Sequence, residues 1–147
     1  VLTSDTSQLA ALKTQLTDPD SAEILPEIIS KEPLGPVVRQ GDDEWFNVVK
    51  WVLFGQINAE EYGITSENVE EMESSDNPSV QRIVGTSGNM GEILGLDDDF
   101  MVDVISQVGN YGEMFERNVG PDTPLGLNCG NNALWTDGGV LYAPPFR

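Results

Sequence analysis

The stretch DDEWFNVVKWVLFGQINAEE, residues 42–61, sets the structural expectations for this chain of 147 residues. Asp42 is a good N-cap residue, and the acidic side chains of Asp43 and Glu44 suit the positive N-terminal end of a helix. Apolar residues then recur at helical spacing on one face, at Trp45, Val48, Val49, Val52, Leu53 and Ile57. Further apolar surface comes from Phe46, Trp51 and Phe54. The stretch therefore predicts a long helix, ended by Gly63, that is covered on more than one side.

Four further helices are predicted on either side of this stretch. Their ranges are 6–16, 65–72, 78–84 and 98–116. The first can be capped by Thr6 or Ser7 and carries three leucines on one face, at Leu9, Leu12 and Leu16. The last carries an apolar face made of Met101, Val104, Ile105, Val108, Tyr111 and Phe115. Gly109 and Gly112 weaken this last helix, which we nevertheless expect to be continuous.

The remaining segments predict extended chain and loops. EILPEIIS, residues 23–30, is short and apolar, and Pro26 assigns it to an edge or a crossing segment rather than to the centre of a sheet. Residues 37–38, two valines, predict a short strand that pairs in a sheet. Residues 85–99 are rich in glycine and predict a loop. The tail from residue 119 predicts only a short helical turn at 132–135.

The charge of the chain excludes several classes of partner. It has 25 acidic and 7 basic residues, which gives a formal net charge of −18. Phosphate backbones repel such a chain, so we expect no nucleic-acid binding. A basic patch for anionic lipid is excluded for the same reason. The acidic excess itself is most simply explained by solubility or by a saline habitat.

The residue inventory argues against an enzyme. The chain has no histidine, which is the commonest general base and the commonest metal ligand, and a single cysteine, Cys129. We predict that Cys129 is neither a nucleophile nor a metal ligand, because no histidine can activate it and no second thiolate can share a metal. No apolar run is long enough to span a membrane. We therefore expect no cofactor and no membrane-spanning segment.

Three local motifs suggest chemistry but have simpler explanations. SDTS, residues 4–7, is faintly similar to an aspartic-protease turn, but no second copy supplies the paired carboxylate. GTSGNMGE, residues 85–92, lacks the Gly-Lys-Ser/Thr of a phosphate loop. The three aspartates at 97–99 match no calcium loop, and acidic residues are expected at a helix N-terminus. Of the tryptophans, Trp45 and Trp51 have the helical spacing of core residues.

Several long motifs resemble one known family. The segment ILPEIISKEPLGPVVRQGDDEWFNVVKWVLFGQINAEE, residues 24–61, resembles the general L-amino-acid-binding proteins of polar amino-acid ABC importers. The similarity continues through VGNYGEMFERNVG (108–120), TPLGL (123–127), NALWTDGG (132–139) and YAPPFR (142–147). It extends over essentially the whole chain and in order. The chain is therefore identified as similar to the C-terminal part of such a protein.

The resemblance implies a fold and a division of the chain. The family has the α/β fold of two-lobed type II periplasmic binding proteins, of which this segment is helix-rich. Residues 1–22 would end the second ligand-binding lobe, residues 23–33 would be the return crossing at the hinge, and residues 34–147 would be the C-terminal part of the first lobe with a subfamily extension. The opening VLTSD has the pattern of an extended segment whose first residues are missing, so we expect a fragment of a longer protein.

The resemblance also implies one ligand contact. Similar receptors carry an aspartate just after a second-lobe strand that receives the ligand's α-ammonium group, and Asp5 matches that position. A carboxylate in a cleft binds an ammonium group through short charge-assisted hydrogen bonds. The alternative is that Asp5 only ends a strand or caps a helix. The family's arginine for the ligand carboxylate is expected outside this chain.

Two functions follow as hypotheses. In the first, the chain belongs to a periplasmic solute-binding subunit that binds L-amino acids with broad specificity by lobe closure and delivers them to the importer's membrane subunits. In the second, it is a stand-alone acidic structural or interaction module without a ligand. Large exposed apolar patches would make a fragment associate, whereas a finished domain should be monodisperse in light scattering.

Overall fold

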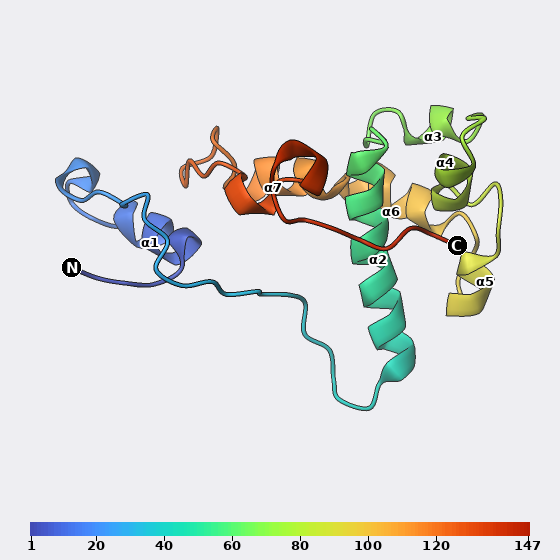
Figure 1. Cartoon of the computed structure of the whole chain (residues 1–147), viewed down its shortest axis with the longest axis horizontal. Helices are drawn as coiled ribbons and strands as arrows, with labels where there is room; N and C mark the ends of the chain where they lie inside the picture. The colour runs from blue at the N-terminus through green and yellow to red at the C-terminus, as the bar shows by residue number, and fades with distance from the viewer. The chain divides into compact units, whose positions relative to one another are not determined.

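The computed structural model describes residues 1–147, and its regular structure is helical (Figure 1). The α-helices are α1 (Thr6–Lys13), α2 (Asp43–Glu61), α3 (Val69–Met72), α4 (Pro78–Ile83), α5 (Met90–Leu94), α6 (Phe100–Val108) and α7 (Tyr111–Val119). Short 3₁₀ turns lie at Pro19–Ser21, Gly130–Asn132 and Trp135–Asp137. A single isolated bridge joins Leu134 and Leu141. The predicted helix-rich character is confirmed, and none of the helices has both the length and the apolar character needed to cross a membrane.

The chain forms two compact units. Unit 1 contains Val1–Pro36 and Phe115–Cys129, and unit 2 contains Val37–Met114 and Gly130–Arg147. Unit 1 holds α1, the first 3₁₀ turn, the part of α7 from Phe115 onward and the segment that follows it, with Ala10 as its buried apolar residue. Unit 2 holds the apolar core. The division at residues 22/23 and 33/34 that the family resemblance implies remains a prediction.

Helix α2 is the centre of unit 2, as the sequence predicts. The Asp42 carboxylate accepts a hydrogen bond from the Trp45 amide at 3.2 Å, and the helix ends before Gly63, whose φ of 67° is left-handed. Two clusters pack on its C-terminal half. One contains Ala59, Ile64, Val69, Val80, Ile83, Val84, Phe100, Met101, Ile105 and Phe146. The other contains Ile57, Leu134 and Ala143. This half is therefore covered on more than one side.

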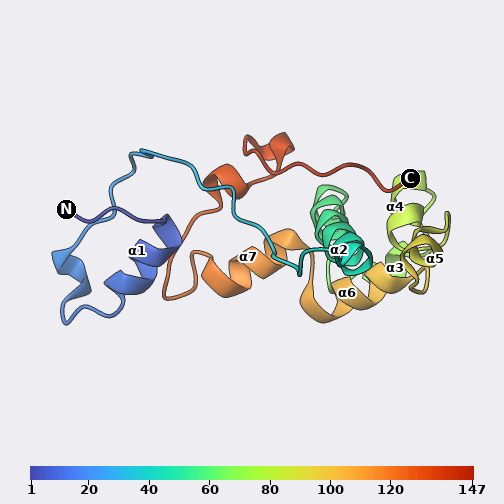
Figure 2. The same cartoon turned by 90° about the horizontal axis from the view of Figure 1, so that it is seen from below.

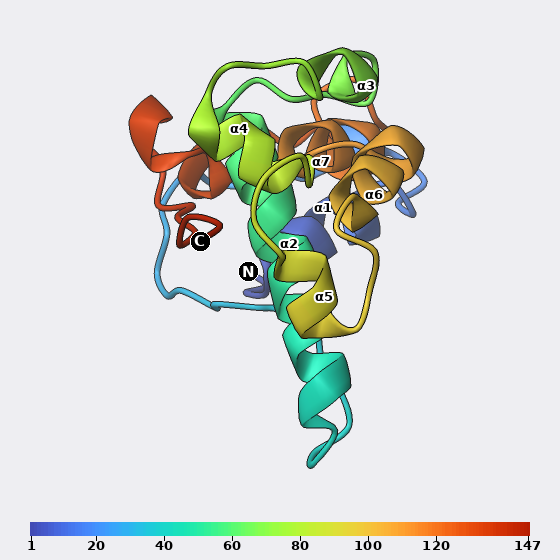
Figure 3. The same cartoon turned by 90° about the vertical axis from the view of Figure 1, so that its right-hand side faces the viewer.

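The first turns of α2 are different. We call Asp43–Lys50 the free turns of α2, because the buried residues of the helix are confined to Gly55–Ala59. Within the free turns Trp45 is 54 % exposed and Phe46 is 48 % exposed. The free turns extend beyond the helices that pack on the rest of α2 (Figure 3). The predicted cover is therefore missing at Trp45 and Phe46, whereas residues 47–50 are half-buried.

The tail of the chain completes the core of unit 2. It crosses α2 in Figure 1, and in Figure 2, seen from below, the C-terminus lies beside α4. The ring of Phe146 lies edge-on to that of Trp51, with centroids 5.4 Å apart, and stacks at 6.4 Å on Phe100. The Asn58 side-chain amide donates to the Pro144 carbonyl at 2.9 Å. The sequence predicts no such role for a tail rich in glycine, proline and asparagine.

The predicted helix at 98–116 is in fact two helices. Gly109 interrupts it with φ 83° and ψ 178°, and a new helix starts after Asn110. The Asn110 side chain accepts from the Glu113 amide at 2.9 Å, and the Glu113 carboxylate accepts from the Asn110 amide at 2.9 Å. This reciprocal pair is a capping box, which satisfies two amides that a helix start leaves unpaired. The pattern of apolar residues continues through the break, so periodicity alone does not detect it.

Replacing Asn110 with alanine should destabilise unit 2. Asn110 is buried, and its side chain also donates to the Ile64 carbonyl at 2.8 Å. Losing the cap and leaving this carbonyl unpaired should together cost about 2–4 kcal/mol in the free energy of unfolding. Urea unfolding followed by circular dichroism measures it. Asn89→Ala is the control, since Asn89 makes no capping hydrogen bond at α5; equal losses in both variants would contradict the assignment.

The glycine-rich segment 85–99 contains α5, which the sequence does not predict. The helix ends at Gly95 in the left-handed conformation. Gly91 packs so tightly that a Cβ atom there would lie 2.1 Å from the Asp97 carbonyl oxygen. The Asp98 carboxylate accepts from the Glu92 amide at 3.1 Å. These glycines therefore allow close backbone packing, and the segment is ordered by it.

The predicted strand at residues 37–38 does not form. Both residues lie outside regular structure, and Val37 is 94 % exposed. A strand needs a neighbouring edge to satisfy its amide and carbonyl groups, and no other segment of this chain offers one. Residues 23–30 lie outside regular structure, with a bend at Pro26, and their assignment to an edge or a crossing segment remains a prediction. Where a short helical turn is predicted around 132–135, two 3₁₀ turns occur, one ending at Asn132 and one beginning at Trp135.

Candidate functional site

Asp5 stands at the N-cap position of α1 in unit 1 and is exposed to solvent. Its backbone carbonyl accepts from the Leu9 amide at 2.9 Å, which begins the helix. Its side chain makes no capping hydrogen bond, while the neighbouring Ser4 hydroxyl bonds to the Gln8 side chain. The Asp5 carboxylate is therefore available to an incoming donor. The positive end of the helix favours a negative charge at this place.

Unit 1 also has an open groove of about 530 Å³ beside α1. Its lining consists of Thr6, Ala10, Lys13, Thr14, Pro19, Glu23, Ile24 and residues 124–127. Asp5 is not part of this lining, although Thr6 follows it directly in the chain. Lys13 and Glu23 give the groove one charge of each sign. Asp5, the predicted contact residue, therefore lies outside the lining of this groove.

The other sequence candidates have structural roles or stay untested. Asp98 holds the start of α5 through its bond to Glu92, and Asp99 is the N-cap residue of α6. The glycine loop at 85–91 packs against residues 97–99. No group of three or more histidine, cysteine, aspartate or glutamate side chains is arranged to hold a metal ion. Cys129 is half-buried, and its predicted inertness remains a prediction.

Glu60, near the end of α2, is a perturbed acid that sequence reasoning does not identify. Its Oε2 atom is buried without a hydrogen-bond partner. Burial raises the pKa of Glu60 above its ordinary value of 4.5, the backbone hydrogen bond from Gly112 opposes this, and the nearby negative charge of Asp137 raises it further. The lack of a side chain at Gly112 makes space for the Glu60 carboxylate, because a Cβ atom there would lie 3.0 Å from it. In the sequence, the glycine at Gly112 is the only sign of its contact with Glu60.

Replacing Glu60 with glutamine should stabilise unit 2 at neutral pH. Because folding raises the pKa of Glu60, its contribution to stability is complete below its unfolded pKa and is lost as pH rises through the folded pKa. The glutamine side chain would keep an acceptor for Gly112 and carry no charge. Urea unfolding should show an advantage of Glu60→Gln over the wild type that grows between about pH 4 and pH 7.

Glu70→Gln is the matched control for this pH series. Glu70 lies on α3 and is exposed. The control variant should track the wild type at every pH, apart from the small gain expected from removing one charge of an acidic surface. An advantage of Glu60→Gln that stays constant with pH would show that Glu60 does not titrate in this range.

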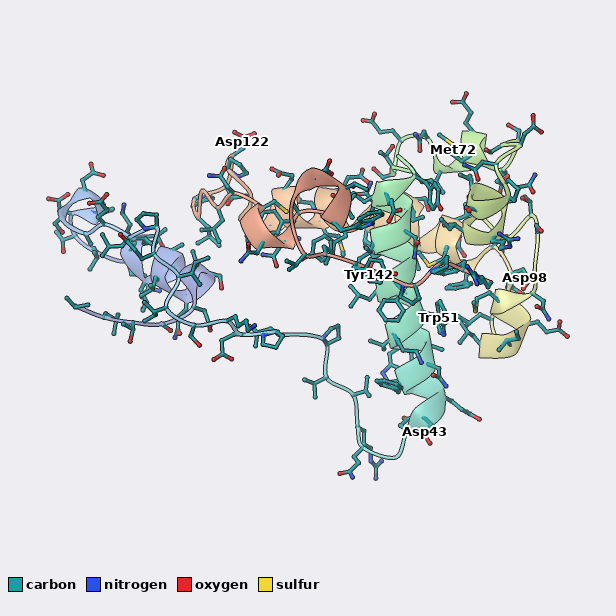
Figure 4. All side chains as sticks on the ribbon, viewed as in Figure 1. Asp43, Trp51, Met72, Asp98, Asp122 and Tyr142 are labelled. Atoms are coloured by element: carbon teal, nitrogen blue, oxygen red, sulfur yellow. The ribbon has the colours of Figure 1, made fainter.

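The tryptophans divide between the core and the surface. Trp51 packs edge-on against Phe54 and Phe146, as a core residue (Figure 4). Trp135 is 53 % exposed and donates its indole N–H to Glu61 at 3.2 Å. Its ring lies 6.4 Å from that of Tyr142. The prediction of a core position therefore holds for Trp51 and fails for Trp45.

Known proteins similar to this chain are amino-acid-binding proteins. No family model matches the chain. A general L-amino acid-binding periplasmic protein, AapJ, from Rhizobium johnstonii is 55 % identical over 149 residues. The putative amino-acid ABC transporter-binding protein YhdW from Escherichia coli is 52 % identical over 147 residues. The glutamate/glutamine/aspartate/asparagine-binding protein BztA from Rhodobacter capsulatus is 52 % identical over 146 residues.

The matches take in almost all of this chain but less than half of each relative. They include 99–100 % of the chain and 43–44 % of the relatives' lengths. A solved structure agrees: an ABC transporter periplasmic binding protein from Brucella ovis with glutathione bound has a TM-score of 0.92 and 51 % identity. The match extends over 98 % of this chain and 46 % of that one. The predicted fold class, a helix-rich part of a type II periplasmic binding protein, is thereby confirmed.

The long motifs that carry the resemblance lie within the matched region, which is nearly the whole chain. Identity above 50 % together with a TM-score of 0.92 leaves no ambiguity about ancestry. Over nearly its whole length the chain is similar to amino-acid-binding proteins of ABC transporters, and it spans a little under half of the length of these relatives.

Proposed function

We propose that the chain is part of the solute-binding subunit of an ABC importer and that this subunit binds L-amino acids with broad specificity. The observation that carries the proposal is the identity of 55 % and 52 % to proteins named for binding amino acids. The partners would be the amino acid and the importer's membrane subunits, and the location would be the periplasm. The protein would bind and release its ligand without chemistry and without a cofactor.

The proposed mechanism is lobe closure. Residues 1–22 would belong to one lobe, residues 23–33 to the hinge crossing, and residues 34–147 to the other lobe with its extension. The extended and exposed backbone of residues 23–33 supports a crossing segment. Asp5 would receive the α-ammonium group of the ligand, and its uncommitted carboxylate supports this role. An arginine outside this chain would receive the ligand carboxylate.

Calorimetry on the full-length protein tests the proposal. Several L-amino acids should bind with dissociation constants in the micromolar range or below, with N-acetyl derivatives as controls. Acetylation removes the positive charge from the α-nitrogen, so the carboxylate of Asp5 loses its partner and binding should disappear. Absence of binding across the set of L-amino acids would refute the proposal. Light scattering on the 147-residue chain tests the second hypothesis, a stand-alone module, which requires a monodisperse particle.

A second ligand class is favoured by the bound glutathione in the similar Brucella ovis structure. Glutathione carries a γ-linked glutamate whose α-ammonium and α-carboxylate groups are both free. A site for amino acids could therefore hold this part of the peptide in the same way. Titration with glutathione and with glutamate separates the two classes. Competition between them would place both in one site, whereas binding of glutathione alone would replace the amino-acid proposal.

A further inference from the structure

The end of α2 carries two adjacent acidic side chains in different surroundings. Glu61 is partly exposed, and its carboxylate accepts a hydrogen bond from the Trp135 indole at 3.2 Å. The carboxyl group of Glu60 instead lies against Gly112 of α7, and its Oε2 atom is buried without a hydrogen-bond partner. A buried oxygen without a partner costs less in a neutral carboxylic acid than in a carboxylate. The surroundings of Glu60 therefore favour its protonated form.

The tail of the chain brings a further acid to this place. Asp137 is the last residue of the 3₁₀ turn Trp135–Asp137, and its negative charge acts on Glu60. The turn is anchored beside α2 by Leu134, which is 4 % exposed and packs in one cluster with Ile57. The hydrogen bond from the indole is a second link between the turn and α2. The turn thus has an apolar anchor on one side and a polar link on the other.

The charges that meet at the end of α2 are mainly of one sign. The titratable side chains on the three elements that meet here are Glu61 on α2, Tyr111 and Glu113 on α7, and Asp137 and Tyr142 on the tail. The carboxylate of Glu113 accepts from the amides of Asn110 and Ser66. The charged group that acts on Glu60 is Asp137. Deprotonation of Glu60 would therefore set two negative charges against each other, and such charges repel strongly when one of them is buried.

We propose that Glu60 is a pH switch that controls the position of the turn Trp135–Asp137 on the end of α2. With a proton on Glu60, the turn lies against the helix and the indole of Trp135 binds Glu61, as in this structure. When Glu60 loses the proton, repulsion from Asp137 opens this hydrogen bond, while Leu134 keeps its place as the pivot. The turn is docked in acid and moves away from the helix as pH rises.

The direction of the switch follows from thermodynamic linkage. Burial and the charge of Asp137 both raise the pKa of Glu60 when the turn is docked, while the hydrogen bond from Gly112 lowers it. Because docking of Asp137 favours the protonated form of Glu60, protonation must in return favour docking. All of these groups belong to unit 2 of this chain, and no ligand takes part. The switch can therefore fail while the proposed function stands, and the reverse.

Fluorine NMR on the full-length protein tests the switch. Fluorotryptophan is incorporated in place of tryptophan, and the signal of Trp135 is identified by its loss in Trp135→Phe. Its chemical shift should titrate with a midpoint above pH 4.5, the ordinary pKa of a glutamate. The solvent isotope shift between water and heavy water, which grows with exposure, should increase over the same range. A signal that does not titrate, or that titrates without a gain in exposure, would overturn the proposal.

Four variants identify the group that titrates. Glu60→Gln should abolish the titration, and Asp137→Asn should lower its midpoint and reduce the gain in exposure, which keeps the test valid if Glu60→Gln does not fold. Glu61→Gln keeps an acceptor for the indole and should retain the titration. Glu70→Gln, an exposed acid on α3, is the control and should match the wild type. A titration that persists in Glu60→Gln, or one that is lost only in Glu61→Gln, would show that Glu60 is not the switch.

Discussion

Phe146→Ala should lower the free energy of unfolding of unit 2 by about 3–5 kcal/mol, the range measured for phenylalanine truncations in protein cores. Phe146 is 4 % exposed, and its ring contacts those of Trp51 and Phe100. A Cβ atom at Gly55 would lie only 3.1 Å from its ring, so the helix approaches it closely. The surrounding groups belong to α2 and α6, which are fixed by the rest of the core, so they cannot fully collapse into the space. Urea unfolding monitored by tryptophan fluorescence measures the loss.

Tyr142→Ala is the matched control for this truncation. Tyr142 belongs to the same tail and is also aromatic, but it is 70 % exposed. Its removal should cost less than about 1 kcal/mol, as for other surface substitutions. Phe146→Leu should fall between the two because it keeps part of the buried volume. A cost below about 1 kcal/mol for Phe146→Ala would show that the tail does not seal the core.

Asp5→Asn in the full-length protein should weaken amino-acid binding by about 2–5 kcal/mol, because the ligand ammonium would be buried without its counter-charge. This corresponds to at least a roughly 30-fold rise in Kd. Asparagine caps helices as well as aspartate does, and the Asp5 side chain makes no capping bond, so stability should not change. Calorimetry gives the affinity and thermal unfolding gives the stability.

Asp20→Asn is the control for charge alone. Asp20 is an exposed aspartate of unit 1 within the first 3₁₀ turn, and its replacement should leave Kd unchanged. An equal loss of affinity in both variants would mean that Asp5 acts through the overall electrostatic field of the protein and not through a contact with the ligand. Unchanged affinity in Asp5→Asn would show that Asp5 does not contact the ligand.

The isolated 147-residue chain should bind amino acids negligibly. An exposed pair between Asp5 and an ammonium group is worth at most about 1 kcal/mol in water. Burial of a zwitterion also requires a partner for its carboxylate, which the family resemblance assigns to a residue outside this chain. Calorimetry with the isolated chain checks this. Micromolar binding would mean that the chain contains a complete site.

The elements that the sequence predicts well are those determined locally. The limits of α2 follow from Asp42 and Gly63, which act on the nearest turns of the helix. The family resemblance rests on long motifs, and the similarity is confirmed at an identity of 55 % to one such protein. The break at Gly109 escapes prediction because the capping pair of Asn110 and Glu113 interrupts the backbone while the apolar spacing continues.

Features that depend on distant partners cannot be predicted in this way. Val37 has the composition of a strand, but a strand also requires an edge to pair with, and this chain has none to offer. The raised pKa of Glu60 depends on Gly112 and Asp137, which no local pattern connects with it. For the site, sequence comparison supplies the position of Asp5, and the structure adds that its carboxylate is uncommitted.

The position of Phe146 has a consequence for the order in which the protein is made. The hydrogen bond between Asn58 and Pro144 joins residues 86 positions apart, and the neighbouring ring of Phe146 is synthesised later still. Translation therefore delivers α2 long before the residues that seal it. A ribosome-bound chain carries Trp51 uncovered until residue 146 emerges. Unit 2 thus matures only after synthesis has passed that point, and a prematurely released polypeptide is left with an open core for proteases to attack.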